Sequence, residues 1–318
     1  MKRRAALLVL ALTAWVAGSA LGTDPSSGPA PAQAAPLMEI GLAHAGYVPS
    51  LDGTEPIFVL FIGSGAREGE DVEHSLADSI HVVGINPAKH KASILGIPRD
   101  SWVEIPGRGS SKINSSMVYG GPDLLVQTVE AVTGITLDYW VLTTFWGLQS
   151  MVNNIGGITI DVPFAMHDPF SRSDFEPGVQ TFDGQEALAF TRDRHSLPEG
   201  DFGRSENAGR LMLAALADFR KEFTKDPSRL FTWVSAGLRN VDTDVPLDQV
   251  LSLAFTAATI NPKTVQNMVV PGSTGMVGGI SVVNLTSSDQ VIFDDMRNDG
   301  LVSKKHVPPS PNAGLLGG

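Results

Sequence analysis

The sequence contains no cysteine in its 318 residues. This absence excludes a disulfide scaffold, a zinc ribbon, an iron–sulfur cluster and a thiol nucleophile, because each needs cysteine sulfur. Positive charge is also scarce, with 23 Lys and Arg against 34 Asp and Glu and a net charge of −11. A generic nucleic-acid binder needs a basic surface, so we expect no nucleic-acid partner. The hydrophobic share of 42% suffices for a core and excludes disorder and collagen.

Long hydrophobic runs are nearly absent, and the one candidate lies at the amino terminus. Residues 5–21 are apolar apart from small or hydroxyl residues, and they follow the basic residues at 2–4. This pattern is typical of a secretion or anchor signal, although the run is shorter than the ~20 residues of a comfortable membrane span. Small residues at 18–20 and 32–34 are candidate cleavage sites. Residues 1–22 are therefore predicted to be a signal peptide or a membrane anchor, with cleavage left open.

The segments after this signal have different compositions. Residues 23–53 are rich in Pro, Ala and Gly, which predicts a linker. Residues 54–302 contain no internal repeat or linker, so we expect one domain there. Residues 303–318 form a Pro- and Gly-rich end, predicted to be a flexible tail. Because the basic flank stays cytoplasmic, the domain is expected on the extracytoplasmic side of the membrane.

Short apolar runs alternate with segments of helical periodicity. Residues 57–62 are a continuous apolar run, as expected for a strand covered on both faces. Residues 121–133 and 145–155 repeat apolar residues at helical spacing, and a glycine follows each segment. The capping-box sequence at 183–186 predicts a short helix. Further strands are predicted over 80–85, 93–97, 158–162, 265–270 and 280–285, and further helices from 201 and over 247–260 and 287–298. This alternation indicates an α/β sandwich with a central sheet.

Arginines stand directly after predicted strands and at the start of a predicted helix. Arg67 follows the first strand and Arg99 follows the third. Arg192 and Arg194 are two residues apart, so in an extended segment their side chains point to the same side. Arg204 lies in the first turn of the helix predicted from 201, where free backbone amides favour an anion. Since strand ends form the usual ligand crevice of such sheets, the pattern predicts a phosphate or pyrophosphate site.

A second interpretation of these arginines is structural. Each guanidinium would then pair with a nearby surface carboxylate of this acidic chain and bind no ligand. Spacing alone leaves both interpretations open.

The motifs, taken in order, resemble those of the LytR-CpsA-Psr family. The resemblance extends over about residues 57–220 and depends on the order of the motifs more than on any single one. The segments that carry it are Gly63-Ser64-Gly65-Ala66-Arg67, Ala77-Asp78-Ser79-Ile80, Ile97-Pro98-Arg99-Asp100, Lys112-Ile113-Asn114, Tyr119-Gly120-Gly121-Pro122, 156–163, 183–190, Arg192-Asp193-Arg194-His195 and Gly200-Asp201-Phe202-Gly203-Arg204.

This resemblance implies an α/β fold, a three-layer α/β/α sandwich with a central mixed sheet and a hydrophobic tunnel for a lipid. It implies a membrane-tethered transferase of the bacterial cell envelope. Such an enzyme moves a glycopolymer from a polyprenyl pyrophosphate carrier to peptidoglycan. The expected partners are therefore a polyprenyl pyrophosphate-linked glycopolymer, a peptidoglycan acceptor and the membrane.

The resemblance also implies roles for single residues. Arg67, Arg99, Arg192, Arg194 and Arg204 match pyrophosphate-binding arginines of the family, and Arg99 is also expected to act in catalysis. Asp78 matches a carboxylate that binds Mg²⁺, the expected cofactor. Asp201 is expected to orient an arginine or to assist the incoming hydroxyl as a base. His195, beside these arginines, is either a proton shuttle or a structural histidine.

Three positions depart from the family pattern. Gly65 replaces an aspartate that usually accompanies Asp78 at the metal, Leu76 replaces an arginine, and 207–209 read Asn-Ala-Gly where Arg-Gln-Gln is common. Mg²⁺ is often held by one or two carboxylates with water and substrate phosphate, so Asp78 alone remains a candidate ligand. Loss of metal binding is the other interpretation.

Three functions fit these residues. The first is the transferase. The second is a non-catalytic carrier or scaffold that retains the lipid-pyrophosphate pocket, suggested by Gly65. The third is hydrolysis of the same carrier by water.

Overall fold

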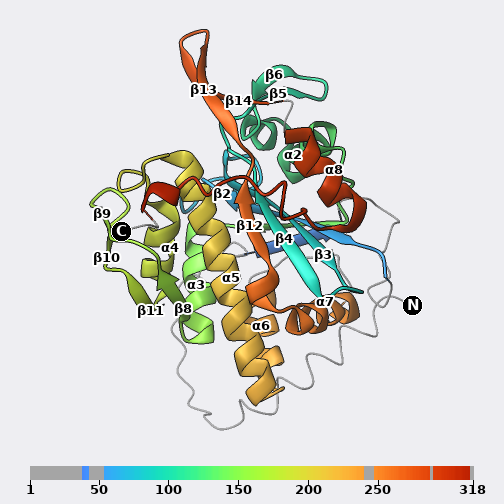
Figure 1. Ribbon diagram of the computed structural model, residues 1–318, viewed down its shortest axis with the longest axis vertical. Helices are drawn as coiled ribbons and strands as arrows, with labels where there is room; N and C mark the ends of the chain where they lie inside the picture. The colour runs from blue at the N-terminus through green and yellow to red at the C-terminus, as the bar shows by residue number, and fades with distance from the viewer. Residues whose placement is uncertain (1–37, 43–53, 240–246, 287–288, 316–318) are drawn as a thin grey trace, which may run out of the picture. The chain divides into compact units, whose positions relative to one another are not determined.

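The centre of the fold is a six-stranded mixed sheet (Figure 1). The computed structural model describes residues 38–42, 54–239, 247–286 and 289–315. The strand order is β1-β7-β2-β3-β4-β12, with β2/β7 and β4/β12 parallel and the other neighbours antiparallel. The strands are β1 (Met38–Leu42), β2 (Ile57–Ser64), β3 (Ala77–Asn86), β4 (Lys91–Gly96), β7 (Tyr139–Thr143) and β12 (Gln266–Val269). The predicted central mixed sheet is therefore confirmed.

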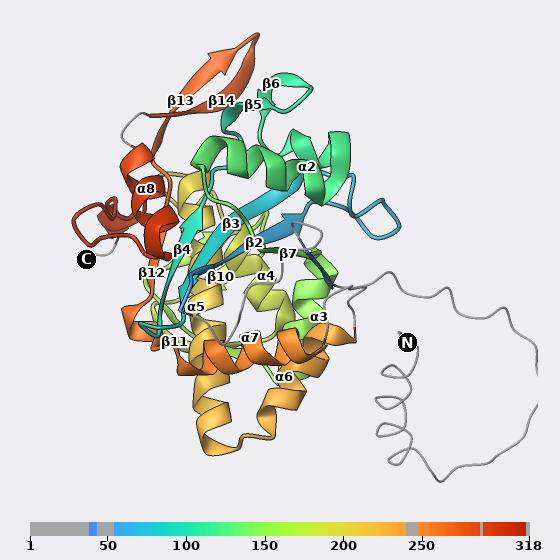
Figure 2. The ribbon, with the colours of Figure 1, turned by 90° about the vertical axis from the view of Figure 1, so that its right-hand side faces the viewer.

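Alternate residues of β2 enter two different cores, because successive side chains of a strand point to opposite faces. Phe58, Leu60 and Ile62 pack in a core with residues of α2 and α8. Ile57 and Val59 pack on the other face, with residues of α5 and α7. These helices are α2 (Ser115–Thr133), α5 (Asp201–Lys225), α7 (Leu247–Thr259) and α8 (Asp289–Asp299). Two faces covered by helices explain the unbroken apolar run in β2 and give the three predicted layers (Figure 2).

Strand direction brings distant segments to one edge of the sheet. Strand β3 runs antiparallel to β2 and β4, so its first residues lie beside the last residues of both neighbours. The register pairs Gly63 with Ser79 and with Thr143, and His81 with Gly96. The segments that follow β2, β4 and β7 therefore leave the sheet beside the start of β3.

A third core lies against α5, on the side of the sheet away from α2. It contains Ile158, Phe182 and Phe190, with Phe182 and Phe190 ring centroids 5.7 Å apart. The predicted capping box is confirmed, since Asp183 Oδ1 accepts from Glu186 N and Glu186 Oε2 accepts from Asp183 N, both at 2.9 Å. The elements here are α3 (Phe145–Ile155), β8 (Ile158–Val162), β9 (Met166–Asp168), β10 (Ser173–Phe175), β11 (Gly178–Phe182), α4 (Gly184–Arg192) and α6 (Arg229–Leu238).

Helix α2 begins six residues before the predicted start at 121. Gly120 and Gly121 leave helical geometry within it, and Gly121 has φ +66°, a conformation that glycine adopts without strain. Pro122 follows and starts the second segment, where its missing N–H is tolerated. The apolar periodicity of 121–133 therefore predicted only the part of α2 that follows the two glycines.

Short paired strands were largely absent from the sequence-based prediction. Strands β5 and β6 form a hairpin, as do β13 and β14, and only β14 was predicted, as the strand over 280–285. Their bounds are β5 (Trp102–Ile105), β6 (Gly109–Lys112), β13 (Gly272–Val277) and β14 (Ile280–Leu285), and two 3₁₀ turns cover Pro262–Thr264 and Ala313–Leu315. Polar hairpin strands lack the apolar alternation on which the prediction rested.

Residues 303–315 pack on the domain, whereas the sequence predicted a flexible tail over 303–318; residues 316–318 lie outside the described residues. Asn312 is fully buried and its Nδ2 donates to Glu206 Oε2 at 2.8 Å and to the Gly203 carbonyl at 3.3 Å. Ser310 Oγ donates to Glu206 Oε2 at 2.8 Å. The buried carboxylate of Glu206 requires these donors, which explains why residues 303–315 are held.

The amino-terminal predictions fall mostly outside the described residues. The expected signal or anchor at 1–22 lies wholly outside them. Within the linker predicted over 23–53, Met38–Leu42 instead forms β1, which covers the otherwise unpaired edge of β7. Residues 35–318 form one compact unit. Among the described helices, none is both long and apolar enough to cross a bilayer.

Candidate functional site

A cavity of about 290 Å³ lies between the sheet and helices α3, α4 and α5. Phe61 of β2, Leu148 of α3 and Leu211 of α5 are among its many apolar lining residues. The charged residues that line the same cavity are Asp78, Arg99, Arg192, Asp201 and Arg204. Five charged groups from four separate segments therefore meet an apolar interior.

The charged groups come together because the start of β3 lies beside the segments that follow β2, β4 and β7. Asp78 is the second residue of β3, and Arg99 follows the end of β4. Arg192 is the last residue of α4, whereas Asp201 and Arg204 form the first turn of α5. The antiparallel register of β3 and β4 places the first two segments side by side, and α5 packs across them.

Asp201 is the centre of the charged cluster. Its Oδ1 accepts from Arg204 Nε at 3.0 Å and lies 3.0 Å from Arg204 Nη2. The Nε atoms of Arg99 and Arg194 lie 3.5 and 3.9 Å from the same oxygen. Asp201 Oδ2 is buried and has no hydrogen-bond partner among the described residues. One carboxylate oxygen thus gathers guanidiniums, and the other makes no hydrogen bond to the described residues.

These charges perturb the titration of the cluster. Burial by itself would raise the pKa of Asp201, but the guanidiniums of Arg204, Arg99 and Arg194 outweigh it and lower that pKa. Burial would lower the pKa of Arg99, but the carboxylates of Asp201 and Asp78 raise it. Asp201 therefore stays ionised and Arg99 stays protonated at neutral pH.

Asp78 is held by Arg99, whose Nη1 donates to Asp78 Oδ1. Gly65 lies directly opposite, because a Cβ atom at this position would stand 2.7 Å from Asp78 Oδ2. A side chain at 65 would therefore point at the Asp78 carboxylate. With glycine at 65 in place of the family's usual aspartate, no second carboxylate from this position faces Asp78.

Backbone contacts fix the loop that carries Arg99. Asn114 N donates to the Arg99 carbonyl at 3.2 Å, and Val283 N of β14 donates to the Asp100 carbonyl at 2.9 Å. Lys112 Nζ lies 3.0 Å from Asp100 Oδ1. The loop is thus clamped from two sides, which orients the Arg99 side chain.

The remaining predicted arginines are more exposed. The Arg192 guanidinium lies over the Phe145 ring, 4.9 Å from its centroid, with no carboxylate partner among the described residues. Arg194 is half-exposed and reaches Asp201 only at 3.9 Å. Arg67 lies on an exposed turn, and no contact found among the described residues joins its guanidinium to the cluster. Its pyrophosphate role stays a prediction.

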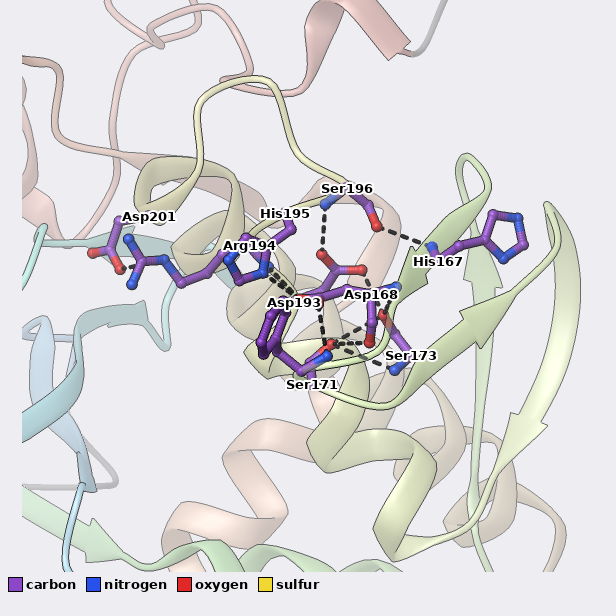
Figure 3. Close-up of polar contacts among 10 residues, drawn as sticks. His167, Asp168, Ser171, Ser173, Asp193, Arg194, His195, Ser196 and Asp201 are labelled. Atoms are coloured by element: carbon purple, nitrogen blue, oxygen red, sulfur yellow. Dashed lines mark hydrogen bonds and ion pairs between the residues drawn. The ribbon is translucent and has the colours of Figure 1, made fainter.

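The segment around Arg194 is anchored by a buried carboxylate (Figure 3). Asp168 Oδ2 accepts from His195 Nδ1 at 2.9 Å and from Arg194 N at 3.5 Å. Burial would raise the pKa of Asp168, but the hydrogen bonds from His195, Phe170 and Arg194 keep it well below its usual range. His195 therefore has the partner that the sequence did not reveal, and this partner fixes the backbone from which Arg194 extends toward Asp201.

His81 is a buried titratable group that the sequence analysis did not identify. Its Nε2 lies 3.0 Å from the Ser205 carbonyl, and Ser79 Oγ lies 3.0 Å from its Nδ1. A carbonyl only accepts, so Nε2 carries the proton and Nδ1 accepts from the serine. Gly96 permits this contact, since a Cβ there would stand 2.4 Å from Ser205 Oγ. His81 thereby ties β3 to the residue after Arg204.

The described residues contain no group of three or more His, Asp or Glu side chains arranged to hold a metal ion. Asp78 is the single carboxylate at the predicted metal position, and one of its oxygens already accepts from Arg99. This donor set fits a Mg²⁺ ion that shares its ligands with a bound phosphate and water, and it does not fit a metal held by protein alone.

His81 generates a pH dependence of stability. Burial, with a contribution from Arg204, lowers the pKa of His81 from 6.5 to about 4, although the Ser205 carbonyl opposes the shift. Between these values the unfolded chain binds the proton and the folded chain does not. We expect the free energy of unfolding to fall by about 3 kcal/mol from this residue as pH drops from 6.5 to 4. Urea denaturation across this pH range measures it.

His81→Gln should flatten this part of the pH profile, whatever its effect on absolute stability. His167→Gln is the matched control, because His167 is exposed and contacts only exposed carboxylates. An unchanged slope in His81→Gln would contradict the assignment.

Two curated relatives are similar to this chain over part of its length. The polyisoprenyl-teichoic acid–peptidoglycan teichoic acid transferase TagU of Bacillus licheniformis is 37% identical over 168 residues, covering 52% of this chain and 53% of TagU. The probable cell wall biosynthesis protein LcpB of Corynebacterium glutamicum is 34% identical over 189 residues, covering 55% and 45%. The matched region thus spans about half the length of each relative.

Solved structures share the fold. Bacillus subtilis TagV superposes with a TM-score of 0.62 at 26% identity, covering 81% of this chain and 100% of TagV. TagT with bound octaprenyl pyrophosphate lipid superposes with a TM-score of 0.60 at 22% identity, covering 81% and 94%. The family model of LytR_cpsA_psr matches residues 38–297. With the fold, the ordered motifs and this match in agreement, the chain belongs to the LytR_cpsA_psr family.

Proposed function

We propose that this protein is a cell-envelope transferase that moves a glycopolymer from a polyprenyl pyrophosphate carrier to peptidoglycan at the extracytoplasmic face of the membrane. The observation that carries the proposal is the apolar cavity lined at one place by Arg99, Arg192 and Arg204. An isoprenoid chain matches the apolar walls, and a pyrophosphate matches the guanidiniums. The teichoic acid transferase names of the relatives and the octaprenyl pyrophosphate bound to TagT support the same substrate class.

The arginines of the site differ in how firmly they are held. Arg99 and Arg204 are held by Asp78 and Asp201, so they form a preorganised positive surface. Arg192 and Arg194 are exposed and only loosely paired, so they are free to close on the pyrophosphate. Together they neutralise the charge that develops on the phosphoryl oxygens during transfer.

In the reaction, an acceptor hydroxyl attacks the sugar-linked phosphorus. The bond from this phosphorus to the bridging oxygen breaks, and the lipid phosphate leaves. The hydroxyl donates a hydrogen bond to the unpaired Asp201 Oδ2, which orients it and receives its proton late in the transfer. A carboxylate of lowered pKa suits such late proton transfer, as in phosphoryl transfer by kinases.

Magnesium enters this proposal through Asp78. The free oxygen of Asp78 would hold a Mg²⁺ ion that arrives with the pyrophosphate. When bound, the ion would supply further neutralisation of the phosphate charge.

The alternative is a non-catalytic carrier with the same pocket. Gly65, in the place of the family's aspartate beside Asp78, is the observation that favours it. Hydrolysis of the carrier by water would differ from both, because it would release a saccharide phosphate and form no adduct with peptidoglycan.

Removal of the exposed arginines tests the anion site. We expect Arg192→Ala with Arg194→Ala to weaken polyprenyl pyrophosphate binding about 100-fold or more, since each substitution removes a charge-assisted contact worth about 1.5 kcal/mol or more. Isothermal titration calorimetry measures the affinity, and Arg239→Ala is the control because Arg239 is exposed elsewhere on the domain. Unchanged affinity in the double variant would overturn the site.

Asp201→Asn separates catalysis from binding. Asparagine keeps an oxygen that can accept from Arg204 and so keeps the arginines in place, while it removes a negative charge that opposes an anion. Pyrophosphate affinity should therefore hold or rise. The transfer rate should fall about 100-fold or more because the proton acceptor is lost. Formation of a covalent adduct between lipid-linked saccharide and peptidoglycan fragments measures transfer. No adduct from the parent with any divalent metal would favour the carrier, and released saccharide phosphate without adduct would favour hydrolysis.

Gly65→Asp tests the metal position. The new carboxylate would face Asp78 at close range, so like-charge repulsion should lower the melting temperature in EDTA. Addition of Mg²⁺ should raise the melting temperature of the variant more than that of the parent. Gly65→Asn controls for side-chain size, and an equal Mg²⁺ response in both variants would contradict an Asp78-centred metal site.

A further inference from the structure

The β13–β14 hairpin projects from the domain, beside the β5–β6 hairpin and above α2 in both views (Figures 1 and 2). Its two strands are joined by Gly278 and Gly279, which both have positive φ. Val282 and Val283 near its base are buried, whereas its tip lies in solvent. The base is therefore fixed, and the tip is presented away from the core.

The tip is apolar and carries no charge. Met276 is 67% exposed and Ile280 is 54% exposed, with Val277 beside them. Residues 264–288 contain no Asp, Glu, Lys, Arg or His in a chain of otherwise acidic balance. Exposed apolar side chains on an uncharged projection mark a surface that is covered in use.

The surface next to the hairpin has the composition of a membrane interface. Val118 and Tyr119 of α2 are exposed at 40% and 44%. The Arg108 guanidinium, at the β5–β6 turn, lies 5.7 Å from the centroid of the Tyr119 ring. Tyrosine and arginine suit the headgroup region, where an apolar body and a polar tip are both accommodated.

The base of the hairpin is continuous with the charged cluster. Val283 N donates to the carbonyl of Asp100, the residue after Arg99. A Cβ at Gly272 would stand 3.6 Å from Phe202 Cζ, and Phe202 follows Asp201. The projection therefore starts where the proposed pyrophosphate site is built.

We propose that the β13–β14 tip inserts its apolar side chains into the surface of a lipid bilayer and holds the charged cluster near the headgroups. A polyprenyl pyrophosphate lies with its chain in the bilayer and its phosphates at the headgroups, so this orientation shortens its path into the cavity. The shorter path for the lipid rests on the proposed function, whereas the insertion rests on the exposed apolar tip of the hairpin.

The absence of cysteine permits a position-specific test. Met276→Cys in the full chain carries one environment-sensitive dye, and the protein is incorporated into phosphatidylcholine–phosphatidylglycerol vesicles without any polyprenyl donor. We expect a blue shift of emission and loss of quenching by aqueous iodide. Val179→Cys is the matched control, because Val179 is an exposed apolar residue on β11, and its dye should stay quenched. Any tether at the amino terminus is shared by both proteins.

Equal quenching at the two positions would overturn the proposal, including the case in which the tip binds another macromolecule. Ile280→Asp supplies a second arm, since a charge inserts poorly into a bilayer. Ile280→Asp should lower the rate of glycopolymer transfer from a donor embedded in vesicles. It should leave the rate of transfer from a short-chain, water-soluble donor unchanged. Equal loss with both donors would also overturn the proposal. The dye measurement needs no transfer, so failure of the proposed function would leave it interpretable.

Discussion

The attraction between the Asp201 carboxylate and the guanidiniums around it is the interaction on which the site depends. Positive groups from separate segments repel one another unless a buried negative charge holds them together. Asp201 Oδ1 contacts Arg204 at 3.0 Å and approaches Arg99 and Arg194 within 4 Å. The lowered pKa of Asp201 expresses the same attraction. This carboxylate gathers arginines from separate segments into one cluster.

The acidic balance of the chain makes this local arrangement necessary. A net charge of −11 repels an anionic substrate at long range, so recognition must act at short range. Burial next to an apolar cavity strengthens each short-range contact, because water no longer screens it. Of the two interpretations that the sequence offered, pairing with carboxylates is seen for Arg99 and Arg204. The anion site stays a prediction, and in the proposed function these paired arginines form the surface to which Arg192 and Arg194 contribute.

Rigid supports surround the cluster. Asp168 fixes the backbone at Arg194, His81 joins β3 to α5, and Asn312 with Glu206 fastens the end of the chain to the same helix. Each support is a buried polar group that has a hydrogen-bond partner far away in sequence. The start of α5, with Asp201 and Arg204, is thus held on several sides.

The sequence by itself determined the class of fold and identified the charged residues that line the cavity. Apolar runs such as 57–62 identified central strands, the capping box identified the start of α4, and the arginines were located by their places after these elements. Such features depend on neighbours within a few residues, which is why local pattern sufficed.

Only the tertiary structure decided which groups meet. The contact of Arg99 with Asp78, the partner of His195, the burial of His81 and the β1 strand within the expected linker all join segments far apart in the chain. Sheet register and strand direction set these meetings, and a one-residue slip would turn each side chain to the other face. The projecting tip of β13–β14 was hidden for the opposite reason: exposure is the absence of neighbours, and no local pattern records which apolar residues the fold leaves uncovered.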